Sequence, residues 1–497
     1  MKNTIPTISR WRKLLRFAVY ALGTLLVLVV VAMYALSLPV VQQRITREAE
    51  SFLQEKLGTR VEVGAIRLRF PYDLSLENFL LEDQQGDTLA RVGSLVISIG
   101  MWKLLNQTIE LEEVILEDAS AYLHHKDSLY NFDFVVQAFS SPDTTTTADT
   151  TASPWKLQLD LTALKLKNVH FLLLDEDTES TTQARIGTAE TIITKADLET
   201  LQFELDGFRL ANSDIRLVQK KKSPHDGKPA PSFGLLLKGG DISRSHLLYV
   251  TPEMSVDATL EKTLLDHLQL RSANDILAIQ AQGVRVENSV LAYRDPAVSP
   301  TPGHFNAGDL DLGQLNAELP DFSFQNDTLY VQADALSGSD KSGLQVHTLK
   351  AVARVTPGSI EIKNAVARLN QTSLDGDVLL FKNKLATFDR MQVQLRQVKG
   401  VIGDLIILLP PQENQAMAQL SDMPYEVSGN LNGWLENLQT NNIHFRAGSG
   451  TVAHFDGSVQ QLTEPTKLGT HLNISRLETN RADLLRWMSV AQSGGVL

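Results

Sequence analysis

The sequence predicts a mainly β protein with an N-terminal transmembrane helix, a short amphipathic helix, and then a long antiparallel β-sheet built from repeated hairpins. Three observations lead to this fold class. An uncharged apolar run occupies residues 17–38, the apolar residues just after it recur at helical spacing, and from residue 59 onward they alternate with a period of 2. That period is typical of strands with one apolar and one polar face.

The apolar run at residues 17–38 is long enough to cross a bilayer core of roughly 30 Å as a helix. Because cytoplasmic flanks carry an excess of Lys and Arg, we expect residues 1–16 to form a cytoplasmic tail. The alternative is a cleavable signal peptide, but its apolar region would be only ~7–15 residues long, and Ala35-Leu36-Ser37 is a weak cleavage site. The residues expected at the membrane interface are Arg10, Arg12, Lys13 and Arg16.

The charge balance narrows the range of partners. The chain has 46 Lys and Arg against 58 Asp and Glu, a net charge of −12. Nucleic acid is not an expected partner, because phosphate binding needs clustered basic side chains. The chain has no cysteine, so disulfides cannot stabilise it in an oxidising compartment.

The chain divides by composition into successive segments. Residues 39–139 are predicted to form a membrane-proximal unit, opening with an amphipathic helix over Val41–Leu57 that we interpret as a cap on the first sheet. Residues 140–154, rich in Thr, lack large apolar side chains and are predicted to be a disordered loop. Residues 155–497 are expected to form the repetitive β-groove.

The alternating segments supply candidates for an apolar lining, because their apolar residues fall on one side of each predicted strand. Asp-Gly dipeptides at Asp206, Asp375 and Asp456 favour tight turns between antiparallel strands. The candidate lining residues are Leu95, Ile97, Ile99, Leu157, Leu159, Leu161, Leu201, Phe203, Leu205, Val284, Val286, Leu344, Val346, Val393 and Leu395.

A short pattern recurs along the chain: an apolar residue, a charged residue and an asparagine, followed by alternating apolar residues. It starts at Leu76, Leu166, Val286 and Ile362, so its intervals vary and a fixed-period solenoid is not indicated. We interpret the pattern as one hairpin unit reused with loops of different length. Chance similarity among β-rich segments is the alternative.

The sequence contains no constellation that predicts catalysis. The histidines are scattered without a metal-ligand spacing, no thiol is present, and no glycine-rich phosphate loop precedes a helix. We therefore predict no enzyme, no cofactor and no metal site. A membrane-tethered enzyme acting on glycans is a third, less favoured reading, since paired carboxylates need no local motif.

Several segments occur in an order that resembles the N-terminal part of the AsmA-like superfamily, and is most similar to the TamB type of Bacteroidota. They include Val61-Glu-Val-Gly-Ala-Ile66, Leu76-Glu-Asn-Phe-Leu-Leu-Glu-Asp83, Trp102-Lys-Leu-Leu-Asn106 and Ile109-Glu-Leu-Glu-Glu-Val-Ile-Leu116; Gly429-Asn-Leu-Asn-Gly-Trp434 resembles the recurring hairpin. The resemblance implies an inner-membrane anchor and a taco-like periplasmic β-groove of the bridge-like lipid-transfer type. It carries over no catalytic residue. TamB-type proteins are longer, so a truncated chain or one that needs a partner is expected.

Two functions follow as expectations. The first is conduction of phospholipid along the apolar groove between the inner and outer membranes of a diderm bacterium, in support of outer-membrane biogenesis. The second is a periplasmic assembly factor or scaffold for outer-membrane proteins, in which the apolar faces are a dry β-sandwich core. An outer-membrane β-barrel or another periplasmic protein is the expected protein partner.

Overall fold

The computed structural model describes residues 37–69, 73–99, 108–139, 156–197, 200–221, 232–273, 276–383, 388–408, 417–461 and 469–492, together with single residues between 20 and 35. The predicted basic tail, most of residues 17–38 and the whole Thr-rich segment lie outside them. Among the described residues, no helix is both long and apolar enough to span a membrane. The chain forms two compact units, residues 1–173 and 174–497, each described by itself.

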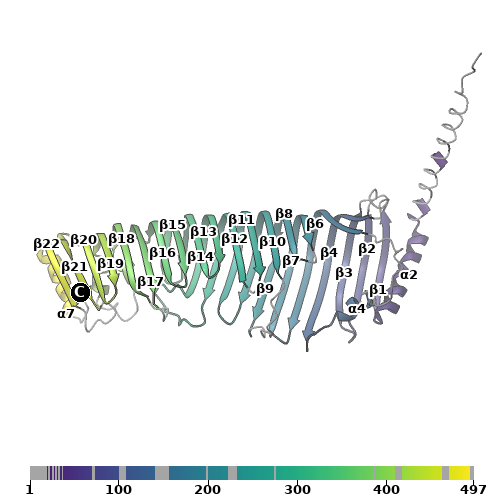
Figure 1. Cartoon of the computed structure of the whole chain (residues 1–497), viewed down its shortest axis with the longest axis horizontal. Helices are drawn as coiled ribbons and strands as arrows, with labels where there is room; N and C mark the ends of the chain where they lie inside the picture. The colour runs from purple at the N-terminus through teal and green to yellow at the C-terminus, as the bar shows by residue number, and fades with distance from the viewer. Residues whose placement is uncertain are drawn as a thin grey trace, which may run out of the picture. The chain divides into compact units, whose positions relative to one another are not determined.

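The N-terminal unit contains helix α2, strands β1–β5, helix α4 and most of β6 (Figure 1). Neighbouring strands from β1 to β4 pair in antiparallel order. Strand β6 is hydrogen-bonded to β4, and the residue numbers of their side-chain contacts rise together, as in parallel strands. The bounds are α2 Pro39–Leu57, β1 Val61–Arg69, β2 Asp73–Glu82, β3 Thr88–Ile99, β4 Thr108–Lys126, β5 Leu129–Tyr130, α4 Asp133–Phe139 and β6 Lys156–Asp175.

Helix α2 covers the free edge of β1 and so caps the first sheet, as the sequence predicts. The Ile66 N–H of β1 donates to Thr46 Oγ1 at 2.9 Å, and Gln54 Nε2 donates to the Val61 carbonyl at 2.7 Å. Gln42 adds a third bond, from Nε2 to the Leu68 carbonyl at 3.2 Å. A sheet edge with unpaired main-chain groups invites pairing with other chains, so α2 protects this edge.

The C-terminal unit is a run of strands that lie side by side in sequence order from β10 to β22 (Figure 1). The bounds are β7 Ser180–Asp197, β8 Gln202–Ala211, β9 Asp214–Gln219, β10 Phe233–Val250, β11 Ser255–Ala273, β12 Ile276–Arg294, β13 Asp309–Gln325, β14 Thr328–Asp340, β15 Gln345–Thr356, β16 Ser359–Leu369, β17 Thr372–Lys382, β18 Phe388–Val401, β19 Pro424–Trp434, β20 Asn437–Ala447, β21 Thr451–Gln460 and β22 Gly469–Glu478, with helices α5 Ile402–Ile406, η2 Ala418–Leu420 and α7 Arg481–Gln492.

In the C-terminal unit too, one strand departs from the predicted antiparallel order. Strands β8 and β9 both pair with β7 antiparallel, so together they act as one long strand interrupted at Asn212 and Ser213. Strand β10 then pairs parallel with both of them. A parallel neighbour needs a connection of a dozen or more residues, and residues 220–232 separate β9 from β10 in the sequence.

The predicted Asp-Gly turns were wrong. Asp206, Asp375 and Asp456, each with its following glycine, lie inside strands β8, β17 and β21. At Gly207 the φ angle is 61°, the left-handed conformation that an Asp-Gly hairpin turn would use. The dipeptide does signal this conformation at that position, but here the chain continues as a strand after it.

Helices pack on the C-terminal unit near its last strands. A buried cluster there contains Val398, Ile402, Leu420, Met423, Tyr425 and Ala447, with Trp487 of α7 against it. The Asp483 carboxylate of α7 accepts from the N–H groups of Gly450 at 2.7 Å and Ser449 at 3.1 Å. Burial opposes ionisation, but these main-chain bonds outweigh it and hold the pKa of Asp483 below its ordinary value. Asn480 caps the helix, accepting from the Asp483 N–H at 2.8 Å, and asparagine is among the preferred residues at this position.

Candidate functional site

The candidate site is the apolar face of the strands, and a left-handed residue within the strands creates it. In β2, Leu76 lies opposite Ile66 of β1, and Phe79 lies opposite Val63. Directly opposed residues of antiparallel strands share a face, and all four side chains pack on one cluster around Val61. The spacing from Leu76 to Phe79 is therefore three residues rather than two. Asn78 lies between them with a φ of 51°.

The recurring asparagine of the sequence pattern is this left-handed residue at every occurrence. Asn78, Asn168, Asn288 and Asn364 have φ angles of 51°, 51°, 43° and 53°. Asn is among the few non-glycine residues that tolerate this conformation. Other strands use Asp118, Gly239, Gly283 or Asn442 in the same way. We call this arrangement the three-residue step, because it keeps apolar residues on one face across an extra residue.

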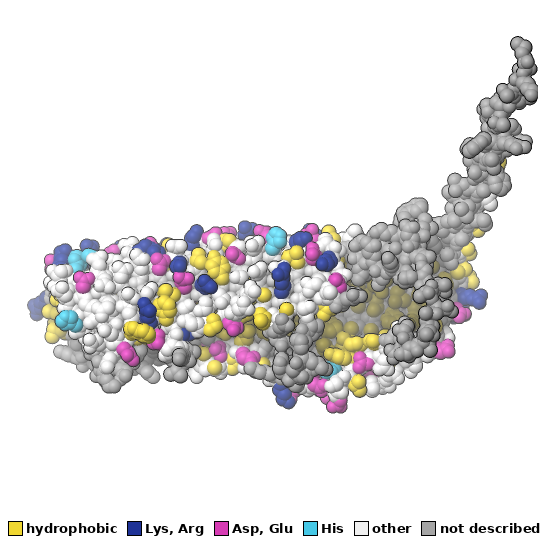
Figure 2. All heavy atoms as spheres, viewed as in Figure 1, with side chains coloured by type: hydrophobic (Ala, Val, Ile, Leu, Met, Phe, Trp, Pro, Cys, Tyr) yellow, Lys and Arg dark blue, Asp and Glu magenta, His cyan; other side chains and the backbone are white. Residues whose placement is uncertain are grey.

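In the N-terminal unit the steps align from strand to strand, so the apolar residues form rows across the sheet. Figure 2 shows hydrophobic side chains lining a hollow over β2–β4 of this unit. One row runs Val63, Phe79, Val92, Ala119 and the next runs Ile66, Leu76, Leu95, Leu116.

In the C-terminal unit two such rows continue without a charged residue from β7 to β22. The first, row B, is Ile193, Leu205, Leu237, Leu268, Ala281, Phe322, Val331, Ala353, Ile362, Val378, Val393, Leu431, Thr440, Gly457 and Leu472. The second, row D, is Ala189, Leu210, Ile242, Thr263, Val286, Ala317, Leu336, Leu349, Ala367, Leu374, Val398, Val427, Phe445, Ala453 and Leu477. Uncharged residues on every strand make this face a continuous apolar strip.

Much of the strip remains accessible. Most row B side chains are half-buried, and in the described part of the chain the only large side chains with almost no exposure are Leu420, Met423 and Val61. In the C-terminal unit the buried cluster involves β18–β20, where helices pack, with Leu374 of β17 against it, and it leaves the strands before β17 outside it. An apolar sheet face needs a covering layer, and these strands lack one among the described residues.

The opposite face carries ion pairs between neighbouring strands. Lys238 Nζ lies 3.4 Å from Glu204 Oε2, and Arg285 Nε lies 3.5 Å from Glu318 Oε1. The polar surface over β13–β21 in Figure 2 mixes charges of both signs. Side-chain alternation thus separates a charged face from an uncharged one.

A three-strand charge bridge on this polar face links β9, β10 and β11. His246 Nδ1 lies 2.9 Å from Asp214 Oδ1, and Nε2 lies 2.9 Å from Asp257 Oδ1. The hydrogen bond to Asp214 raises the pKa of His246 above its ordinary value. Burial alone would raise the pKa of Asp214, but bonds from Arg216 and His246 outweigh it and lower that pKa.

The predicted lining residues are placed unevenly. On β3, Leu95 and Ile97 lie opposite Leu76 and Leu74, and Ile99 lies opposite Leu111. Leu205, Val286 and Val393 fall in rows B and D, and these strands also carry Phe203, Val284 and Leu395, opposite Leu235, Leu319 and Gly429. Val346 lies opposite Gly338 and Leu369.

Two predicted lining residues lie outside the strands. Leu201 occupies a turn with a φ of 52°, just before β8. Leu344 is buried immediately before β15 begins. Leu157, Leu159 and Leu161 are on β6, but their side chains are outside the described part, as are Arg10, Arg12, Lys13 and Arg16.

Most residues of rows B and D were not predicted from the sequence, because the apolar residues stop alternating strictly at every three-residue step. A signal was present: an apolar pair three residues apart with Asn, Asp or Gly before the second member, as in Leu116 to Ala119 around Asp118.

The comparison with known families agrees with this architecture. A model of the AsmA family matches residues 11–239, which include the N-terminal unit and the strands up to the start of β10. This part of the chain is AsmA-like. No curated protein matches the chain. The match covers a little under half of the sequence, and the apolar rows of this AsmA-like protein continue beyond it, to β22.

Proposed function

We propose that this AsmA-like protein, of the TamB type, is anchored in the inner membrane by residues 17–38 and conducts phospholipid through the periplasm toward the outer membrane. One observation supports this above others: rows B and D contain no charged residue between β7 and β22, and they lack a covering layer among the described residues of β8–β16. Acyl chains can supply that cover, because burying each of their CH₂ groups is favourable by about 0.8 kcal/mol.

The opposed polar face supports the same proposal. Lipid headgroups stay hydrated while acyl chains lie against an apolar strip, and a sheet with one uncharged face offers such a strip without closing around it. No group in rows B and D would have to change protonation, so conduction itself needs no chemistry from the chain.

The test is a matched pair of substitutions on adjacent strands. Val331 of β14 belongs to row B, whereas Val352 of β15 lies on the polar face opposite Gln332 and Lys363. Val331→Asp places a charge on the strip and should reduce the phospholipid that co-purifies with the full chain, measured by mass spectrometry of extracted lipid. Val352→Asp, with Lys363 as a neighbour, should leave the lipid content unchanged.

Circular dichroism should show the same β content for both variants. Wild-type protein without bound phospholipid, or equal lipid content in the two folded variants, would contradict the proposal.

A role as an assembly factor is the second candidate, and one observation favours it. Within the described part of the chain, strand β22 pairs with β21 alone, and Ile474 and Leu477 on it are among the exposed large hydrophobic residues. Such an edge can add a strand from a partner protein. Photo-crosslinking from position 474 in cells should capture one specific protein if this candidate holds, and lipid alone if it does not.

A further inference from the structure

The polar face of the C-terminal unit carries a second candidate site, a shallow furrow across strands β13–β19. Two adjoining hollows of about 390 Å³ and 520 Å³ share Glu361 and Lys363 of β16. Strands in a sheet lie about 4.8 Å apart, so six spacings make the furrow roughly 29 Å long. The charged and amide side chains that line it alternate in sequence with row B and therefore face away from the apolar strip. The row B residues Ile362, Val378, Val393 and Leu431 lie between them in sequence and complete the lining of the smaller hollow.

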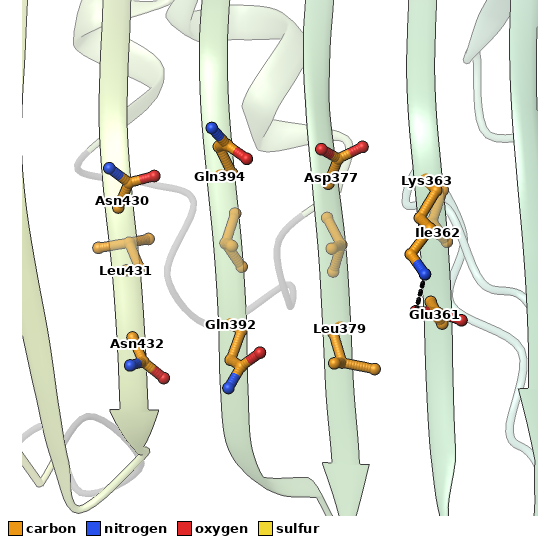
Figure 3. Close-up of a pocket in the computed structure, with 12 residues that line it drawn as sticks. Glu361, Ile362, Lys363, Asp377, Leu379, Gln392, Gln394, Asn430, Leu431 and Asn432 are labelled. Atoms are coloured by element: carbon orange, nitrogen blue, oxygen red, sulfur yellow. Dashed lines mark ion pairs between the residues drawn. The ribbon is translucent and has the colours of Figure 1, made fainter.

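Four amide side chains form the floor of the smaller hollow (Figure 3). Gln392 lies opposite Asn432, and Gln394 lies opposite Asn430, on strands β18 and β19. None of the four has a hydrogen bond to another described protein group, whereas Gln397 on the same strand donates to Glu426 at 2.8 Å. Each amide offers two donors and one acceptor oxygen. These four side chains, which we call the amide grid, therefore present both donors and acceptors to a ligand.

The charges in this hollow neutralise one another. Lys363 Nζ lies 2.6 Å from Glu361 Oε1, and Arg396 donates to Asp377 at 2.6 Å. This pairing lowers the pKa of Asp377, mainly through the hydrogen bond from Arg396, so the carboxylate remains ionised and paired. A hollow of this kind has no net attraction for phosphate or for a cation. It favours a neutral polar ligand.

Aromatic side chains lie at both ends of the furrow. Trp434 lies two residues after Asn432, on the same face of β19. Its large apolar side chain is 56% exposed. Tyr330 lines the other hollow. Exposed rings beside amides bind sugar rings, because the C–H faces of a pyranose stack on the aromatic plane while its hydroxyl groups bond to the amides.

We propose that this furrow binds an extended, neutral glycan. An extended peptide fits less well, because peptides are usually held by main-chain pairing at a sheet edge, and here the main chain of β18 is already paired on both sides. One sugar ring is about as long as one strand spacing, ~4.8 Å, so successive rings can meet successive strands. Acetamido groups on the sugars would pair with the amide grid.

The experiment is isothermal titration of the full chain with a hexamer of β-1,4-linked N-acetylglucosamine. Wild-type protein should bind it, with little change on adding salt because the ligand carries no charge. The double variant Gln394→Ala/Asn430→Ala and the single variant Trp434→Ala should each lower affinity at least about tenfold, which is 1.4 kcal/mol. Gln397→Ala, on the same strand with its amide already bonded, should change affinity less than about twofold.

Three outcomes would overturn the glycan proposal: no binding of the hexamer by the wild-type chain, equal binding by all variants, or preferential binding of an unstructured peptide of similar length. Because all four substituted side chains lie off rows B and D, co-purified phospholipid should be the same in every variant. Loss of lipid without loss of glycan binding would bear on the proposed conduit alone.

Discussion

Leu76 and Phe79 lie on the same face of β2 although two residues separate them, because Asn78 turns the strand at a φ of 51°. Strands normally return to a face every second residue. Gly64 of β1 lies beside Asn78, and Gly93 of β3 lies beside Asp118 of β4; at each glycine an added Cβ would come within 2.8 Å of the Cβ atom of that neighbour. The step is thus a feature of the sheet, shared between neighbours.

The first prediction concerns this step. Asn78→Ala should lower the free energy of unfolding of the N-terminal unit by about 1–2 kcal/mol, because the left-handed conformation is unfavourable for alanine by about this amount. Asn78→Gly should be nearly neutral, since glycine adopts positive φ without a Cβ clash. Thermal unfolding followed by circular dichroism compares the two. Equal stability of the Ala and Gly variants would show that the φ angle is unimportant.

The second prediction concerns the protected edge of β1. Thr46→Val keeps the shape of the side chain but leaves the Ile66 N–H without its acceptor, at a cost of about 1–3 kcal/mol. Hydrogen exchange at Ile66 should become faster. Thr46→Ser retains the hydroxyl and should exchange like wild type; fast exchange in both variants would mean that the helix, not the hydroxyl, protects this amide.

The third prediction concerns the attachment of α7. Asp483→Ala should cost about 2 kcal/mol, because the N–H groups of Ser449 and Gly450 lose their acceptor. Since the pKa of Asp483 is lowered on folding, its contribution is present above the ordinary carboxyl pKa and declines as the pH falls through the lowered value. Hydrogen exchange in the β20–β21 hairpin measures the loss. Asp422→Ala, which removes only an exposed pair with Arg486, is the control and should have little effect.

The fourth prediction is a pH dependence at His246. Its pKa is raised on folding, so its stabilising contribution is complete below the ordinary histidine value and is lost as the pH rises through the folded value. His246→Gln should therefore destabilise β9–β11 by up to about 1 kcal/mol near pH 5.5 and by less near pH 8.5. Chemical denaturation at the two pH values provides the comparison. A pH-independent difference would exclude the charge bridge as its cause.

The sequence was sufficient to predict a mainly β chain with one apolar face, because alternation survives between steps, as at Leu95 and Ile97. It was also sufficient for the cap helix, whose stripe from Val41 to Leu57 has helical spacing, and for the asparagine repeat. It could not reveal the parallel pairing of β10, since strand direction depends on where the crossover returns the chain. Nor could it distinguish a turn from a step at Gly207, because both need positive φ.

The furrow could not be predicted from the sequence, for a different reason. Gln392 and Asn432 are far apart in the chain and become neighbours only through the register of β18 with β19. Polar residues on an outward face carry no periodic signal of their own. Trp434 stood out in the sequence only as part of a hairpin motif.

The rows of the C-terminal unit cross its strands instead of following them, and this has a consequence for how such a chain can change in length. Tandem duplication of one hairpin would insert two strands, lengthening the apolar strip by about 9.6 Å while leaving its width and side-chain composition as they were. Deleting a single residue inside one strand would instead invert every side chain on one side of the deletion. Whole hairpins are therefore the unit in which this architecture can grow or shrink. Within a strand, substituting a residue is tolerated far better than inserting or deleting one.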